Sequence, residues 1–86
     1  MYIHIGQNAV IREKNVIGIF DMDAVTVTKT ARDFLSDAEK DGRVIYLSPY
    51  DLPKSFIVCK EDGKLNIYIS PLSTSTIKNR IFSKNL

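Results

Sequence analysis

The chain has 86 residues, of which 44% are hydrophobic, and a formal net charge of +2. This length suits one domain, residues 1–86, and the single cysteine excludes a disulfide framework. No run approaches the ~20 apolar residues of a membrane span, and the N-terminus lacks the features of a signal peptide, so we expect a soluble cytoplasmic protein.

The first half of the chain is predicted to contain three strands and one helix. Tyr2–Ile5 and Ala9–Arg12 are expected to be a strand and its return strand, separated by the polar turn residues 6–8. Val16–Phe20 is rich in β-branched residues, which favours a third strand. Residues 27–41 repeat apolar side chains at i, i+4, i+7, i+8 and i+11, which predicts an amphipathic helix with Gly42 as its C-terminal cap.

The second half is predicted to contain three more strands. Val44–Leu47 is expected to be a strand that leads into a proline-containing loop. Ser55–Lys60 and Leu65–Ser70 are expected to form a hairpin, because the Asp62-Gly63 pair between them is typical of a two-residue hairpin turn. The expected fold is therefore α+β, with a small mixed or antiparallel sheet and the helix at about 27–41.

A short helix over about residues 74–83 is predicted to close the chain. Five hydroxyl side chains stand at or before its start: Ser70, Ser73, Thr74, Ser75 and Thr76. Ser73 or Thr74 is expected to cap the helix, with Ile77 and Ile81 turned inward. A helix N-terminus can also receive a phosphate, but the cap and the phosphate compete for the same N–H groups, so we expect the cap.

Two predicted strands are apolar on both faces. In Val16–Phe20 one face carries Val16, Gly18 and Phe20 and the other carries two isoleucines, and Phe56–Cys59 is likewise apolar throughout. A sheet with one solvated face alternates apolar and polar residues, which these strands do not. Two helices are expected to cover only one side of the sheet, so a second copy of the chain is predicted to cover the other. The alternative is a small sandwich that closes within one chain.

The sequence contains no recognisable catalytic constellation. His4 is the only histidine and is expected at the surface, while the apolar neighbours of Cys59 predict an inert buried thiol. Asp21 and Asp23 have no further ligands nearby, so a solvated turn is expected rather than a metal site. No glycine-rich phosphate loop is present. We expect no enzyme, no cofactor, no metal, no small-molecule substrate and no membrane partner.

Basic residues on predicted loops and helix ends are the remaining candidates for function. Residues 54–86 hold six cations against two carboxylates, whereas the rest of the chain is slightly acidic. The candidate DNA-binding residues are Arg12, Lys14, Lys54, Lys78 and Arg80. Repeated by the symmetry of a homo-oligomer, a few phosphate contacts per subunit would bind DNA strongly with low sequence specificity.

Four segments carry a resemblance to a known family: MYIHIG, NVIGIFD, PKSFIV and YISPLSTSTIKNR. They resemble the Rem family of bacterial extracellular-matrix regulators, in particular its RemB-like branch, with RemA-type members more distant. The resemblance covers nearly the whole chain. It implies a cytoplasmic DNA-binding regulator that assembles into a ring and promotes transcription of biofilm-matrix genes.

The chain departs from RemA-type members at three positions. Asn15, Leu52 and Pro53 stand where those members place arginines, and Lys54 is the only cation of that loop. Lysine contacts phosphate as a point charge without arginine's bidentate fork, so the departure favours DNA binding that is weaker, less specific or absent. The alternative function is an oligomeric protein-interaction module that modulates another regulator without binding DNA. The placement of the basic residues distinguishes the two, and the role of Tyr50 stays open.

Overall fold

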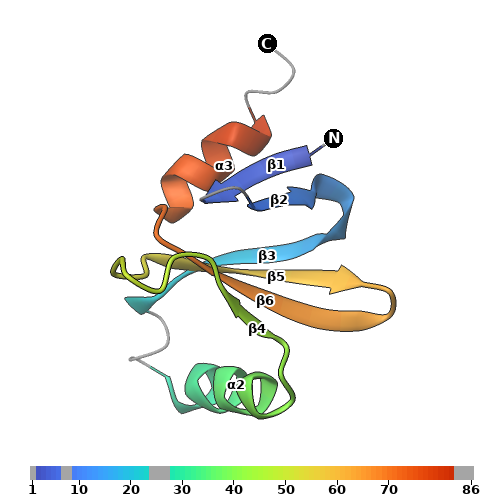
Figure 1. Ribbon diagram of the computed structural model, residues 1–86, viewed down its shortest axis with the longest axis vertical. Helices are drawn as coiled ribbons and strands as arrows, with labels where there is room; N and C mark the ends of the chain where they lie inside the picture. Colours follow the sequence, from blue (N-terminus) through green and yellow to red (C-terminus); the bar gives the residue numbers. More distant parts are fainter. Residues whose placement is uncertain (1, 7–8, 24–27, 83–86) are drawn as a thin grey trace.

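The fold has three layers, as the computed structural model in Figure 1 shows. The structure describes residues 2–6, 9–23 and 28–82. A central four-stranded sheet is covered by helix α2 on one face and by a two-stranded hairpin with helix α3 on the other. Gln7, Asn8, Val27 and Ser83, which the sequence assigned to a turn or to helix ends, lie outside the described residues.

The elements follow the predicted order closely. The strands are β1 (Tyr2–Gly6), β2 (Ala9–Arg12), β3 (Val16–Asp21), β4 (Val44–Tyr46), β5 (Ser55–Glu61) and β6 (Lys64–Ser70), and the helices are η1 (Glu13–Asn15, a 3₁₀ turn), α2 (Lys29–Lys40) and α3 (Thr74–Phe82). The large sheet has the order β3-β5-β6-β4, in which β4 runs parallel to β6 and the other neighbours are antiparallel. The predicted α+β class with a mixed sheet is confirmed.

Helix α2 begins and ends where the local sequence directs. The Thr28 hydroxyl oxygen accepts a hydrogen bond from the N–H of Ala31 at 3.2 Å, which is an N-terminal cap. Leu35 and Ala38 are buried against the sheet, as the apolar periodicity predicted. Gly42 has a φ of +72°, the left-handed conformation expected after a helix end.

The β5–β6 hairpin is closed by a turn with positive φ at both central residues. Asp62 has a φ of 52° and Gly63 a φ of 79°. These values belong to a type I′ turn, whose twist matches that of the two strands. The hairpin predicted from the Asp-Gly pair is confirmed, and it fixes the register with Ile57 opposite Tyr68.

Both faces of β5 are buried within a single chain. Ile57 and Cys59 pack with the isoleucines of β1, β2 and α3, while Phe56 and Val58 pack with the buried residues of α2 and β6. The expectation that the elements of one chain cover only one side of the sheet is wrong, because the β1–β2 hairpin forms a third layer together with α3. The alternative prediction, a sandwich that closes within one chain, describes β5 correctly, so the apolar faces of β5 no longer support the prediction of an oligomer.

A β-bulge in β3 changes which side chains share a face. Val16 lies opposite Cys59 and Gly18 lies opposite Val58, so the residue between them, Ile17, is extra. Val16 therefore packs with the β1–β2 side of the core, contrary to the expected grouping of Val16 with Gly18 and Phe20. Ile17 instead lines the α2 side of the sheet and is 59% exposed.

Candidate nucleic-acid interface

The predicted DNA-binding residues do not form one patch on a single chain. Lys14 lies just before Val16, which is opposite Cys59 near one end of β5. Lys54 lies just before Ser55, at the other end of the same strand. With a rise of ~3.3 Å per residue, the two lysines are separated along the sheet by roughly 15–20 Å. Lys14 and Lys54 therefore lie at opposite ends of the sheet, and Lys78 and Arg80 lie on α3, which packs beside β1 in another layer (Figure 1).

The end of the sheet that carries η1 is the more basic of the two. Arg12 and Lys14 are exposed just before Val16, which pairs with Cys59, and the tip of the β5–β6 hairpin therefore brings the exposed Lys60 and Lys64 to the same end. Residues 12–15 and 60–64 together hold four cations and three carboxylates. The guanidinium of Arg12 lies over the ring of Tyr2, 5.8 Å from its centroid, within cation–π range. We call this end, with Arg12, Lys14, Lys60 and Lys64, the basic end.

One carboxylate of the basic end is already engaged by neutral donors. Glu61 accepts a hydrogen bond from the Tyr68 hydroxyl at 2.7 Å and from the Asn66 amide at 3.0 Å. Burial, followed by this hydrogen bond to a carboxylate, raises the pKa of Tyr68. The Glu61 side chain therefore reaches along β6 towards Asn66 and Tyr68, and within the part of the chain that the structure describes no ion pair joins it to either lysine of the hairpin tip.

The opposite end of the sheet, around Lys54, is acidic. The Lys54 carbonyl accepts a hydrogen bond from Met22 N–H at 3.1 Å, which places Lys54 beside Asp21 and Asp23. Asp51, three residues before Lys54, accepts a hydrogen bond from the Ser48 hydroxyl at 2.5 Å. One cation near three carboxylates makes a poor site for a phosphate, because the carboxylates and the phosphate carry charge of the same sign and repel each other.

Both basic residues of helix α3 are at the surface, and one of them makes a hydrogen bond within the fold. Lys78 and Arg80 are both exposed. The Arg80 guanidinium donates a hydrogen bond to the backbone carbonyl of His4 at 2.9 Å, which ties α3 to β1. Arg80 therefore has a structural role within the chain, which leaves Lys78 as the more available of these two cations.

The start of α3 is capped by its own hydroxyls. The Ser73 hydroxyl oxygen accepts a hydrogen bond from Thr76 N–H at 3.2 Å, which confirms the predicted cap. The Thr74 hydroxyl donates to the Asp21 carboxylate at 2.8 Å. Because this carboxylate lies at the helix N-terminus, it occupies the position that a bound phosphate would need.

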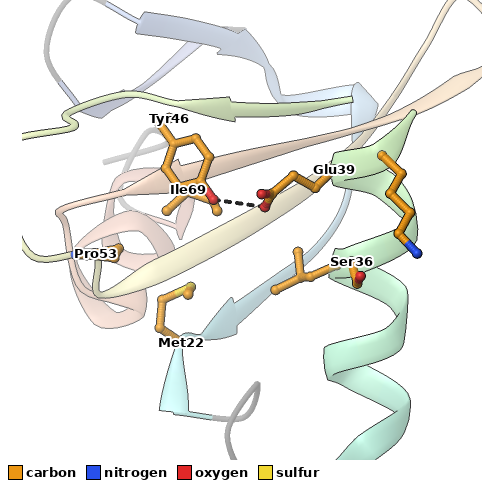
Figure 2. Close-up of a pocket in the computed structure, with 8 residues that line it drawn as sticks. Met22, Ser36, Glu39, Tyr46, Pro53 and Ile69 are labelled. Atoms are coloured by element: carbon orange, nitrogen blue, oxygen red, sulfur yellow. Dashed lines mark hydrogen bonds between the residues drawn. The ribbon is translucent and has the colours of Figure 1, made fainter. Parts of the chain in front are cut away.

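The positions of the expected family arginines differ in their surroundings. Asn15 and Pro53 are half-buried, whereas Leu52 is 83% exposed. Pro53 lines a cleft between α2 and β4, together with Met22 and Ile69 (Figure 2). None of the three side chains can carry a positive charge, so the loop before β5 contributes only Lys54 to phosphate binding.

The cleft in Figure 2 is crossed by a hydrogen bond between β4 and α2. The Tyr46 hydroxyl donates to the Glu39 carboxylate at 3.0 Å, which joins β4 to α2. Burial and this carboxylate both raise the pKa of Tyr46. A tyrosine hydroxyl with a raised pKa keeps its proton and donates a hydrogen bond to the carboxylate. Tyr46 therefore connects β4 to α2 and is not activated as an acid or base.

Within the described ranges, the chain brings together no group that suggests catalysis or metal binding. Cys59 is fully buried, and this burial raises the pKa of its thiol to about 12, which confirms the predicted buried thiol. His4 is exposed on β1, as expected. Across residues 2–6, 9–23 and 28–82, no cluster of three histidine, cysteine or carboxylate side chains could hold a metal, and no helix is long and apolar enough to cross a membrane.

Sequence reasoning missed Lys60 and Lys64 as members of the basic end. The hairpin that carries them was predicted, but their closeness to Lys14 depends on the pairing of β3 with β5. That pairing joins segments about forty residues apart in the chain, so no local pattern contains it.

Comparisons with known proteins identify similar sequences. A family model described as "RemA-like: Extracellular matrix regulatory protein A-like" matches residues 2–81. The chain is also similar to the protein named "Extracellular matrix regulatory protein B" of Bacillus subtilis (strain 168). The two sequences are 38% identical over 80 residues, which cover 93% of this chain and 89% of that protein.

Proposed function

The chain belongs to the RemA-like family of extracellular matrix regulatory proteins, and we propose that it is a cytoplasmic, ring-forming transcriptional regulator that binds DNA through phosphate contacts. The genes it regulates would be those of the extracellular matrix of a biofilm. The observation that carries the proposal is the basic end, where Arg12 and Lys14 meet the lysines of the β5–β6 hairpin.

The side chains of the basic end suit phosphates rather than base edges. Lysine is a point charge on a flexible stem, which neutralises a phosphate without reading a base. Such contacts release counterions from DNA and give an affinity that falls steeply with salt. Any preference for particular promoters would then arise from DNA shape and bending, which a ring can impose on the duplex.

The five candidate residues differ in their surroundings. Arg12, Lys14 and Lys78 are exposed on the β1–β2 and α3 layer or beside it, and their charges are available to DNA. The Arg80 guanidinium already donates a hydrogen bond to the carbonyl of His4, and Lys54 lies beside Asp21 and Asp23. We therefore expect Arg12 and Lys14 to contribute most of the phosphate binding and Lys54 to contribute least.

A second function, the protein-interaction module, is favoured by a separate observation. The loop before β5 presents Tyr50, which is 98% exposed, and Leu52, which is 83% exposed, with Asp51 between them. An apolar and acidic loop is suited to a protein partner and unsuited to DNA. The two functions are compatible if this loop builds the assembly and the basic end binds the nucleic acid.

Fluorescence anisotropy of a labelled duplex, titrated with the protein at several salt concentrations, tests the proposal. The wild-type protein should bind with a log K that falls linearly with log salt. Lys14→Ala should flatten the slope by about 0.9 for each phosphate that the variant no longer neutralises, whereas Lys54→Ala should change it little. Lys40→Ala, an exposed lysine on α2 in the opposite layer, is the control.

The oligomeric state is measured by light scattering in the same buffers. Absence of binding at low salt by an intact oligomer would exclude DNA as the partner and favour the interaction module. A slope that Lys54→Ala flattens more than Lys14→Ala would mean that the phosphates bind at the acidic end of the sheet, contrary to our proposal.

A further inference from the structure

Two apolar surface features are formed by residues outside the basic end. The first is the tip of the loop before β5, formed by Tyr50 and Leu52, which we call the apolar tip. The second is a groove of about 470 Å³ between β3 and the first half of α2, which we call the β3–α2 groove. We propose that the apolar tip of one copy of the chain docks in the β3–α2 groove of the next copy. This inference rests on the assembly included in the proposed function and names its interface.

The apolar tip is unusually exposed and is held in shape. Tyr50 is 98% exposed and Leu52 83% exposed, so water surrounds nearly all of two large side chains. Asp51 N–H donates to the Ser48 carbonyl at 3.2 Å, which closes a turn within the loop. Prolines on both sides, at 49 and 53, restrict the backbone further. A pre-shaped apolar protrusion loses little conformational entropy when it binds.

The β3–α2 groove offers a matching apolar surface. The residues that line it include Ile17, Phe20, Thr30, Phe34, Phe56 and Val58. Ile17 reaches this face because of the β-bulge, and the ring of Phe20 stacks on that of Phe56 with centroids 5.1 Å apart. Ile17 is 59% exposed and Phe20 43%, so burying this surface would remove apolar area from water.

The apolar tip does not fill the groove of its own chain. The loop packs on the other side of α2, where Pro53 lies beside Tyr46 and Ile69 (Figure 2). The 98% exposure of Tyr50 shows that its side chain contacts almost nothing within the chain. One chain thus holds both halves of an interface on different surfaces. Such halves join identical copies head to tail, and the resulting interface closes into a ring when the rotation permits.

Charge complementarity favours this loop over an uncharged apolar partner. Asp51 lies between the two side chains of the apolar tip and is exposed. The groove lies beside the first turn of α2, which carries Lys29 and has no acidic residue. The N-terminus of a helix holds a partial positive charge, so a docked Asp51 would meet both this charge and Lys29. Docking uses neither Arg12 nor Lys14, so these two cations of every subunit stay free for DNA.

Paired variants and light scattering test the interface. Tyr50→Ser with Leu52→Ser removes the apolar tip without touching the core. Thr30→Glu places a charge in the groove, where it repels Asp51, and an acid in the first turn of α2 also favours the helix dipole. Each variant alone should be a monomer of 9.7 kDa. An equimolar mixture should form a dimer of twice that mass and nothing larger, because only one intact tip and one intact groove remain.

The control and the contrary outcomes separate this inference from the proposed function. Val10→Ser removes an exposed apolar side chain from β2 and should leave the wild-type mass unchanged. Phe34→Ser is a second groove variant in case Thr30→Glu loses its cooperative thermal transition. A wild-type oligomer that neither variant dissociates overturns the interface but leaves the assembly standing. A monomeric wild type overturns both the interface and the ring, while DNA binding is judged separately by anisotropy.

Discussion

Replacing Ile57 and Ile67 by valine, one at a time, tests whether both faces of the large sheet are closed within one chain. The two isoleucines are both fully buried, and they face opposite sides. Ile57 packs against the β1–β2 and α3 layer, and Ile67 packs against α2. They form a matched pair because the same methyl group is removed from each face.

Each substitution should lower the free energy of unfolding by about 0.5–1.5 kcal/mol, the usual cost of Ile→Val at a buried site. A domain of this length has a total stability of roughly 4–13 kcal/mol, so both variants should still fold. Ile→Ala, at about 2–5 kcal/mol, would remove too large a share of that stability. Ile45→Val, at a site that is 37% exposed, is the control and should cost less than about 0.5 kcal/mol.

Urea unfolding followed by circular dichroism, at two protein concentrations a hundredfold apart, gives the comparison. If one chain closes both faces, the loss at Ile57 and the loss at Ile67 should keep the same ratio at both concentrations. A cost at Ile57 that disappears on dilution, while that at Ile67 persists, would show that another subunit completes the β1–β2 side. That result would refute the three-layer description of a single chain.

Three further outcomes follow from local features of the structure. Burial raises the pKa of Cys59 from 9.0 to about 12, so the folded protein should resist alkylation of its thiol. Its stability should fall as the pH rises from about 9 towards 12, because the unfolded thiol ionises first; Cys59→Ala should weaken this pH dependence in urea titrations and leave the part that comes from the raised pKa of Tyr46 and Tyr68. Ser73→Ala removes the cap of α3 and should cost about 1 kcal/mol in thermal unfolding, whereas the exposed Ser75→Ala should cost much less. Gly63→Ala forces a side chain onto a φ of 79° and should destabilise the hairpin by about 1 kcal/mol or more, and an unchanged melting temperature would contradict the type I′ assignment.

The sequence determined most of the local structure. The Asp62-Gly63 pair predicted the hairpin, because those residue types tolerate the positive φ that the turn requires. The apolar repeat before Gly42 predicted α2, because a period of 3.6 residues places its members on one side of a helix. The adjacent hydroxyls of Ser73 and Thr74 predicted a cap for α3, because such side chains accept hydrogen bonds from the first N–H groups of a helix, and the structure assigns this role to Ser73. Each of these features depends on residues within a few positions of one another.

The tertiary structure decided how those elements meet. The layer that covers the second face of β5 joins residues 2–12 with α3, from opposite ends of the chain. The bulge at Ile17 and the gathering of Lys60 with Lys14 both depend on the pairing of β3 with β5. The sequence of β5 is a continuous apolar run, which indicates that both of its faces are buried. The same run would be expected whether the covering elements belong to this chain or to a second copy. Which of the two occurs depends on how segments far apart in the sequence pack together, and the periodicity of residues along the chain carries no information about that packing.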